Sequence, residues 1–201
     1  MHSISSDNPS GETKSVCPWY ALYTRHRHEK TVAHILTNKG FEILLPLYPD
    51  ARRWKDRTKL ISLPLFPCYV FLKGGLERRL DIVTTPGIHA FVLSGEQPAR
   101  ISTVEIEAIR RFVASGARLE PHPFLKSGDW VRVKSGPLEG VEGILVRKKN
   151  AYRLVLSVEM LGKAAAVEVD AVQVERLNDK ASFRYSGGYA RDSIITERRI
   201  A

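Results

Sequence analysis

The strongest constraint on the fold of this chain is an apolar run at residues 63–72, which reads LPLFPCYVFL. Its second half, residues 69–71, has strong β preference and is followed by two glycines, so it is typical of a strand covered on both faces. Pro64 and Pro67 cannot donate ladder hydrogen bonds and impose an extended backbone ahead of that strand. The side chain of Phe66, held between the two prolines, is therefore expected to point into a surface groove instead of the core.

Composition excludes several classes of protein. The 201 residues suffice for one or two domains, and 43% hydrophobic and 26% charged residues are typical of a soluble globular protein. No apolar run approaches the roughly 18 residues of a membrane span, and the polar N-terminus lacks a signal-peptide core. Cys17 and Cys68 form no disulfide framework and no spacing is typical of a metal site. We expect a cytoplasmic protein with no membrane contact, metal or cofactor.

The positive charge is concentrated in the first large segment. The chain carries a formal net charge of +9, with a pI near 9.7. Residues 16–115 hold 15 Lys and Arg against 9 Asp and Glu, a balance of +6. This excess favours a nucleic acid or an acidic protein as partner. Many proteins are equally basic without binding nucleic acid, so charge alone does not decide the function.

Residues 16–116 show the pattern of an α+β domain. We expect strands at 19–23, 41–45, 60–72 and 88–93, and an exposed hairpin that ends in the apolar run. A helix after the first strand has Val32, Ile35 and Leu36 on one face, with Thr24 as its cap. Residues 102–105, Ser-Thr-Val-Glu, match a capping box before a second long helix. The strands outnumber the helices, which predicts an antiparallel or mixed sheet with helices packed on it.

The residue pattern of the sequence changes after the second long helix. Residues 117–127, which contain Pro121 and Pro123 and few apolar positions, are interpreted as a linker. Residues 128–178 contain five short strands with tight turns, which predicts a small β-barrel. Residues 1–15 are expected to be a disordered leader and residues 179–201 a flexible tail.

Both halves carry motifs of one known family. Residues 128–133 (GDWVRV), 136–140 (GPLEG) and 143–145 (GIL) resemble a KOW domain. Residues 19–23 (WYALY), 64–71 (PLFPCYVF) and 86–92 (PGIHAFV) resemble, in order, the N-terminal domain of NusG. The details are similar to the specialised NusG paralogs of the RfaH and UpxY type. The resemblance covers about residues 17–178.

The resemblance implies a transcription elongation factor, not an enzyme. In this family the N-terminal domain binds the clamp helices of RNA polymerase through an apolar patch and suppresses pausing or termination. Tyr23 and Phe66 match that patch, with Phe71 and Phe91 as further positions; ordinary core packing is the alternative for each. RfaH-like proteins contact the gate loop of the polymerase through a region that corresponds here to Arg78 and Arg79. In this chain that contact is therefore either ionic or absent.

The resemblance also implies nucleic-acid and protein partners. Specialised members contact the non-template DNA strand after the first strand, and the basic hairpin offers further cations for DNA. The alternatives are that the cations at the helix start are simply solvated and that those of the hairpin keep its edge strands soluble. The KOW domain recruits termination factor Rho or a ribosomal small-subunit protein. The DNA candidates are Arg25, His26, Arg27, His28, Arg52, Arg53 and Lys55, and the KOW candidates are Leu138, Val141 and Leu161.

The sequence is compatible with several functional interpretations. The opening motif and the basic helix start favour an operon-specific antiterminator acting as a monomer over a housekeeping NusG that works with Rho. A ribosome-associated KOW protein that binds RNA would explain the charge and the barrel but not the aromatic N-terminal motifs. An enzyme is disfavoured because no catalytic triad, paired carboxylate, phosphate-binding glycine loop or Cys/His cluster is visible.

Overall fold

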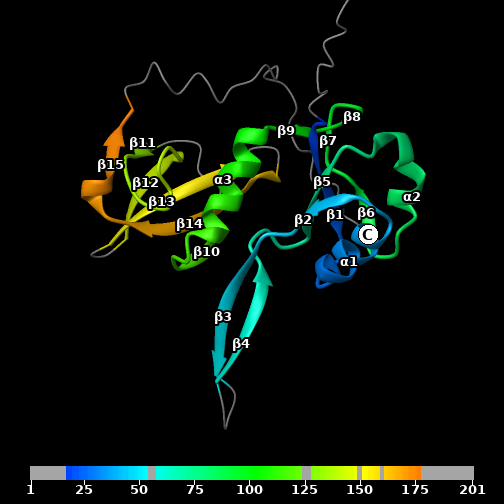
Figure 1. The fold of residues 1–201 in the computed structure, drawn as a ribbon, viewed down its shortest axis with the longest axis horizontal. Coiled ribbons are helices and arrows are strands. Elements are labelled where there is room, and N and C mark those ends of the chain that lie inside the picture. Colours follow the sequence, from blue (N-terminus) through cyan, green and yellow to red (C-terminus); the bar gives the residue numbers. More distant parts are fainter. Residues whose placement is uncertain (1–16, 54–57, 124–127, 149–150, 159–160, 178–201) are drawn as a thin grey trace, which may run out of the picture.

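The computed structural model describes residues 17–53, 58–123, 128–148, 151–158 and 161–177 (Figure 1). These residues form a mixed α+β structure whose strands pair antiparallel. The expected leader, residues 1–15, and the expected tail, residues 179–201, lie outside this range. Among the described residues no helix is long and apolar enough to cross a membrane.

The N-terminal sheet is built around the second half of the apolar run. Its strand order is β2 (Glu42–Leu44), β5 (Tyr69–Lys73), β1 (Trp19–Thr24) and β6 (Ile88–Phe91), and the short β9 (Arg100–Ile101) also pairs with β1. Strand β5 is hydrogen-bonded on both edges and its three central residues are buried. The prediction of a strand covered on both faces is thus confirmed for residues 69–72. Residues 65–68 form a turn ahead of it.

Side chains alternate between the two faces of this sheet, as the pleat requires. Helices α1 (Glu29–Asn38) and α2 (Arg79–Val83), the latter preceded by the 3₁₀ turn η1 (Leu76–Arg78), pack against one face. Helix α3 (Thr103–Ala114) packs against the other. The first face holds Tyr20, Leu22, Val70 and Leu72 with Val32, Leu36 and Ile82, and the second holds Trp19, Ala21 and Phe71 with Ile106, Ile109 and Phe112.

The predicted N-terminal cap is present at α3 but not at α1. The capping box before α3 is confirmed, because Ser102 accepts a hydrogen bond from the Val104 amide and the Glu105 carboxylate accepts one from the Ser102 amide. The expected cap of α1 is wrong. Thr24 still belongs to β1, and α1 begins after His28, whose side chain makes no capping bond. The loop between them is four residues long, so Thr24 is too far from the helix to cap it.

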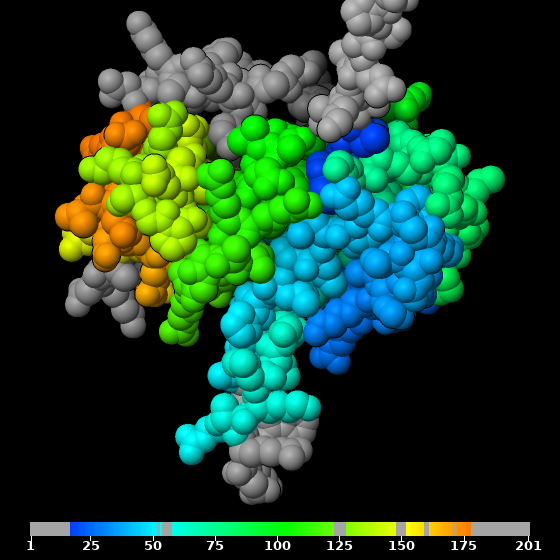
Figure 2. Space-filling view, viewed as in Figure 1, coloured from blue at the N-terminus to red at the C-terminus, as the bar shows by residue number. Residues whose placement is uncertain are grey.

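The predicted hairpin is present and projects from the body of the protein. Strands β3 (Leu47–Arg53) and β4 (Thr58–Pro64) pair with each other and with no other described strand. Figures 1 and 2 show this ribbon extending away from both sheets. A second, very short hairpin joins β7 (Leu93–Ser94) to β8 (Gln97–Pro98).

The C-terminal sheet has six strands instead of five. Its order is β10 (Leu119–Pro123), β14 (Lys163–Val169), β13 (Ala151–Val158), β12 (Glu142–Lys148), β11 (Asp129–Val133) and β15 (Val174–Arg176), with the 3₁₀ turn η3 (Ala171–Gln173) before β15. The first and last strands of this order are not paired with each other among the described residues. The expectation of a closed five-stranded barrel is therefore corrected to an open sheet.

The sixth strand comes from the segment that was expected to be a linker. Residues 117–127 include β10, which pairs with β14 along its whole length. Pro121 and Pro123 favour a linker in the local sequence pattern. Among the described strands β10 pairs with β14 alone, and an edge strand tolerates residues that cannot donate to a ladder. Arg153 on β13 also binds Glu120 of β10 and Glu168 of β14, which fastens the added strand to the sheet.

Helix α3 lies between the two sheets (Figure 1). It contacts β13 of the C-terminal sheet while its apolar stripe packs on the N-terminal sheet. One buried cluster therefore runs through both halves of the chain. From the N-terminal half it contains Trp19, Phe66, Phe71, Ile109 and Phe112, and from the C-terminal half Val131, Leu138, Val141, Leu154, Leu156, Val158 and Leu161.

Candidate interaction surfaces

An exposed group of aromatic rings lies where β1, β5 and β6 meet. The Tyr23 ring stacks on His89 at a centroid distance of 5.4 Å and lies 5.6 Å from the Tyr69 ring. Tyr23 is 44% exposed, which suits a side chain that docks on a partner. Burial raises the pKa of Tyr69, and the neighbouring Tyr23 and Cys68 add to this. The binding role of Tyr23 stays a prediction.

Phe66 is not the exposed side chain that the sequence suggested. It is 1% exposed, and its ring meets Phe71 edge to face at 5.8 Å. The turn closes tightly, because the Leu65 amide donates to the Pro46 carbonyl and the Tyr69 amide donates to the Phe66 carbonyl. Phe66 thereby enters the apolar cluster that α3 and the C-terminal sheet share. The expectation of a surface position is wrong for this arrangement of the chain.

The KOW positions are buried in the same cluster. Leu138, Val141 and Leu161 are each less than a tenth exposed and belong to the buried cluster that also contains residues of α3 and of the N-terminal sheet. The structure therefore brings the expected polymerase face and the expected KOW partner face together. Neither Phe66 nor these three residues is open to a partner while the two halves are in contact.

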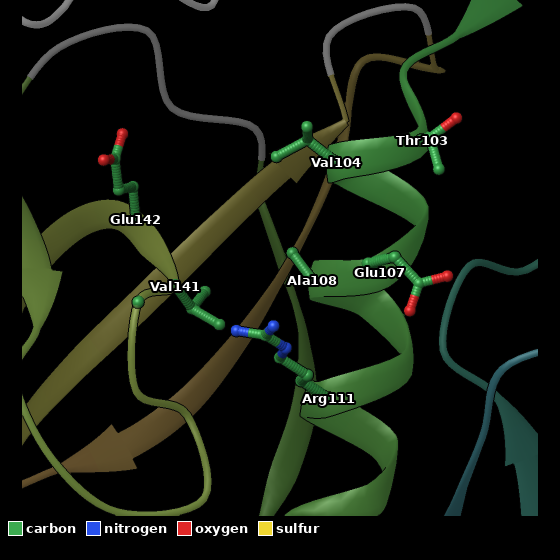
Figure 3. A pocket seen from close by; sticks show the side chains of 8 residues that line it. Thr103, Val104, Glu107, Ala108, Arg111, Val141 and Glu142 are labelled. Carbon is green, nitrogen blue, oxygen red and sulfur yellow. The ribbon is translucent and has the colours of Figure 1, made fainter.

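A groove runs along the line where α3 meets the C-terminal half (Figure 3). Its volume is about 300 Å³. Arg111 extends from α3 toward the turn that carries Val141, and its Nη1 donates a hydrogen bond of 2.8 Å to the Glu139 carbonyl oxygen. The lining residues are Thr103, Val104, Glu107, Ala108 and Arg111 from α3, with Gly140, Val141 and Glu142 opposite.

The remaining polymerase candidates have internal contacts. Phe71 and Phe91 are buried, in agreement with the core alternative. The Arg79 guanidinium lies 5.7 Å from the Phe91 ring centroid. Arg78 lies 4.3 Å from the Phe41 ring centroid, pairs with an Asp81 oxygen at 3.1 Å and donates to the Lys39 carbonyl oxygen. These contacts give Arg78 a structural function that needs no partner protein.

The candidate DNA-binding residues lie on two separate elements. Arg25, His26, Arg27 and His28 form the loop between β1 and α1, and all four are exposed. On the projecting hairpin, Arg53 is exposed and Arg52 pairs with Lys59 across the ladder. Lys55 lies outside the described residues. The two elements present cations on the same N-terminal half, and DNA binding by either stays a prediction.

The structure also groups three potential metal ligands that the sequence did not connect. His26, Glu29 and Cys68 have ligand atoms within 4.8 Å of one another. Cys68 is distant in sequence from the other two residues, so no local spacing signals the group. Burial raises the pKa of the Cys68 thiol and Glu29 adds to the rise, whereas Lys163 of the C-terminal sheet opposes it.

Comparison with known proteins points to one family. Residues 18–110 match the family model described as transcription termination factor nusG. The transcription termination/antitermination protein NusG of Helicobacter pylori strain J99 is 27% identical over 172 residues, covering 79% of this chain and 98% of that protein. The NusG of Halalkalibacterium halodurans is 24% identical with the same coverage.

A solved structure has the same fold. It is described as "Domain interaction in Thermotoga maritima NusG" and superposes with a TM-score of 0.51 at 22% identity. The match covers 80% of this chain and 97% of that one. It therefore includes both halves of the chain and agrees with the α+β architecture described above.

Proposed function

This chain belongs to the NusG family through its N-terminal half, and on that premise we propose that it is a transcription elongation factor. It binds the clamp helices of RNA polymerase and suppresses pausing or termination, and it acts in the cytoplasm as a monomer. The relatives named above are transcription termination/antitermination proteins and not enzymes. The chain's excess of positive charge suits a partner complex that contains DNA.

The observation that carries this proposal is the aromatic group around Tyr23. An exposed tyrosine that stacks on one ring and lies beside a second offers a large, rigid contact area at low cost in side-chain entropy. Tyr23 has the same strand parity as Trp19 and Ala21, so it continues the face that holds Phe66 and Phe71. The polymerase surface then consists of an exposed rim at Tyr23 and an apolar centre at Phe66.

The arrangement of the two halves represents a closed state in this proposal. Phe66 is buried in the cluster that includes Leu138, Val141 and Leu161, so polymerase binding through Phe66 requires the C-terminal half to move away. The same movement exposes the three KOW positions to a second partner. The description of the Thermotoga maritima structure reports a domain interaction in that NusG, which supports the same interpretation here.

The finer function we propose is that of a specialised, operon-specific antiterminator. The four-residue loop at Arg25–His28 would contact the non-template DNA strand, and the freed C-terminal sheet would recruit a ribosomal small-subunit protein. The exposure of all four loop residues supports the DNA contact. A housekeeping NusG acting with Rho is the second candidate, since the named relatives have termination as well as antitermination in their names.

A retention assay with RNA polymerase tests the proposal. Immobilised full-length chain should retain core polymerase, and Tyr23→Ala should weaken retention by about tenfold, since a docking aromatic contributes at least 1.4 kcal/mol. Leu93→Ala is the matched control, because Leu93 is 48% exposed on another strand. Equal retention of both variants, or co-sedimentation with ribosomes in place of polymerase, would contradict the polymerase assignment.

A further inference from the structure

Three metal-binding side chains meet beside the N-terminus of α1. His26 comes from the loop after β1, Glu29 is the first residue of α1, and Cys68 ends the turn ahead of β5. The His26 Nδ1 and Cys68 Sγ atoms are 3.8 Å apart. Tetrahedral zinc with ordinary Zn–N and Zn–S bond lengths places such atoms about 3.6 Å apart. Only a small movement is needed for both to bind one ion.

The backbone fixes the position of Cys68. The Thr24 amide donates to the Cys68 carbonyl oxygen at 2.8 Å, and the Cys68 amide donates to Glu29 Oε1 at the same distance. Cys68 has a φ of 69° and Arg27, in the opposite loop, a φ of 64°. Both non-glycine residues are thus held in the left-handed region, which local preference disfavours. The tertiary structure, and not local preference, therefore places these side chains near one another before any ion binds.

Two buried polar groups lie at the same place. The Glu29 side chain is almost completely buried although it belongs to a residue type that is rarely so. The Thr24 hydroxyl is buried and has no hydrogen-bond partner among the described residues. The backbone of Thr24 lies beside Cys68, because the Thr24 amide donates to the Cys68 carbonyl oxygen. Polar groups buried without partners are costly, and such groups often adjoin a site for an ion or water.

We propose that His26, Glu29 and Cys68 bind one divalent transition-metal ion of the zinc type, with a water molecule as fourth ligand. Imidazole nitrogen, thiolate sulfur and carboxylate oxygen together suit zinc and disfavour magnesium or calcium, which select oxygen ligands. The ion would join the basic loop at residues 25–28 to the turn that carries Phe66. It would thereby hold the two predicted contact regions in a fixed relation.

Cobalt(II) titration of the full-length chain tests this proposal. Cobalt reports tetrahedral coordination through its visible bands and thiolate ligation through a charge-transfer band in the near ultraviolet. We expect one ion per chain with both signals, and displacement of cobalt by zinc. Cys68→Ser should abolish the charge-transfer band. His26→Gln and Glu29→Gln should each weaken the affinity by about tenfold or more, since even losing a supporting partner of a ligand costs that much.

Two matched controls identify adventitious binding. Cys17→Ser removes the other cysteine, which is exposed, and His34→Gln removes an exposed histidine of α1 that hydrogen-bonds Asn38. Both should bind cobalt as the unchanged chain does. The charge-transfer band surviving in Cys68→Ser, or disappearing in Cys17→Ser, would overturn the proposal. If circular dichroism shows that Cys68→Ser is unfolded, His26→Gln provides the test, because His26 is exposed. Unchanged cobalt affinity of His26→Gln would then overturn the proposed site.

Discussion

Arg111 on α3 donates a hydrogen bond of 2.8 Å to the backbone carbonyl of Glu139, in the turn that leads into β12. This bond crosses from one half of the chain to the other, alongside the shared apolar cluster. It adds a directional polar contact to the apolar packing of that cluster. A single substitution can remove this contact, because the exposed Arg111 side chain is not part of the apolar cluster.

Replacing Arg111 with alanine should loosen the closed arrangement. The lost hydrogen bond from a charged donor costs about 1.5–3 kcal/mol at most, and less at this exposed position. Amide hydrogen exchange on the buried face of α3 should become faster, and retention of RNA polymerase should rise. Arg110→Ala is the matched control, because the partners of Arg110, Glu42 and Glu107, both lie in the N-terminal half. Equal effects of the two variants would refute a specific function of Arg111.

Phe66→Ala should destabilise the chain strongly. Truncating a fully buried phenylalanine costs about 3–5 kcal/mol, because it removes apolar contacts and leaves a cavity. Tyr23→Ala removes an exposed ring and should cost about 1 kcal/mol or less. Urea denaturation followed by circular dichroism measures both. A small loss for Phe66→Ala would indicate that Phe66 is exposed in solution and that the open state dominates.

Ser102→Ala should destabilise the chain by about 1 kcal/mol. The substitution removes the oxygen that caps the Val104 amide and leaves the Glu105 half of the capping box alone. Thermal unfolding measures the loss. Thr103→Ala, at the next residue, is the control and should change stability by less, since Thr103 lies inside the helix and the cap is Ser102. A neutral Ser102→Ala would show that packing alone positions α3.

Glu42 should contribute to stability in a pH-dependent way. The hydrogen bond from Lys73, and after it the charge of Lys73 and the contact with Arg110, hold the pKa of Glu42 below its ordinary value of 4.5, although desolvation opposes this. A lowered folded-state pKa stabilises the fold above pH 4.5, and the contribution is lost as pH falls through the folded-state pKa. Because Glu42 is half exposed, we expect less than about 1 kcal/mol.

Comparison with Glu42→Gln measures this contribution. The difference in unfolding free energy from the unchanged chain should be present at pH 7 and shrink below about pH 4. A Glu42→Gln, Lys73→Met double-mutant cycle isolates the pair. A difference that stays constant across this pH range would mean that lost packing, not charge, accounts for the effect.

The sequence determined most of the local structure. Short runs of apolar and β-favouring residues predicted β1, β5, β6 and four strands of the C-terminal sheet, and the Ser102–Glu105 box predicted α3, because these signals act between near neighbours. The family motifs at residues 64–71 and 128–133 likewise predicted the NusG relationship. Strand β10 was missed, because its two prolines are tolerated only at an edge, and edge position is a property of the assembled sheet.

Tertiary structure alone decided which surfaces are open. Phe66 and Val141 are apolar at positions that suit either core or contact surface, and the local pattern is the same in both cases. Their burial follows from the packing of α3 and the C-terminal sheet on the N-terminal sheet, a contact between segments far apart in the chain. The proximity of His26 to Cys68 also results from contacts between segments far apart in the chain. The sequence thus determined the elements and the family, whereas long-range packing determined what each element leaves accessible.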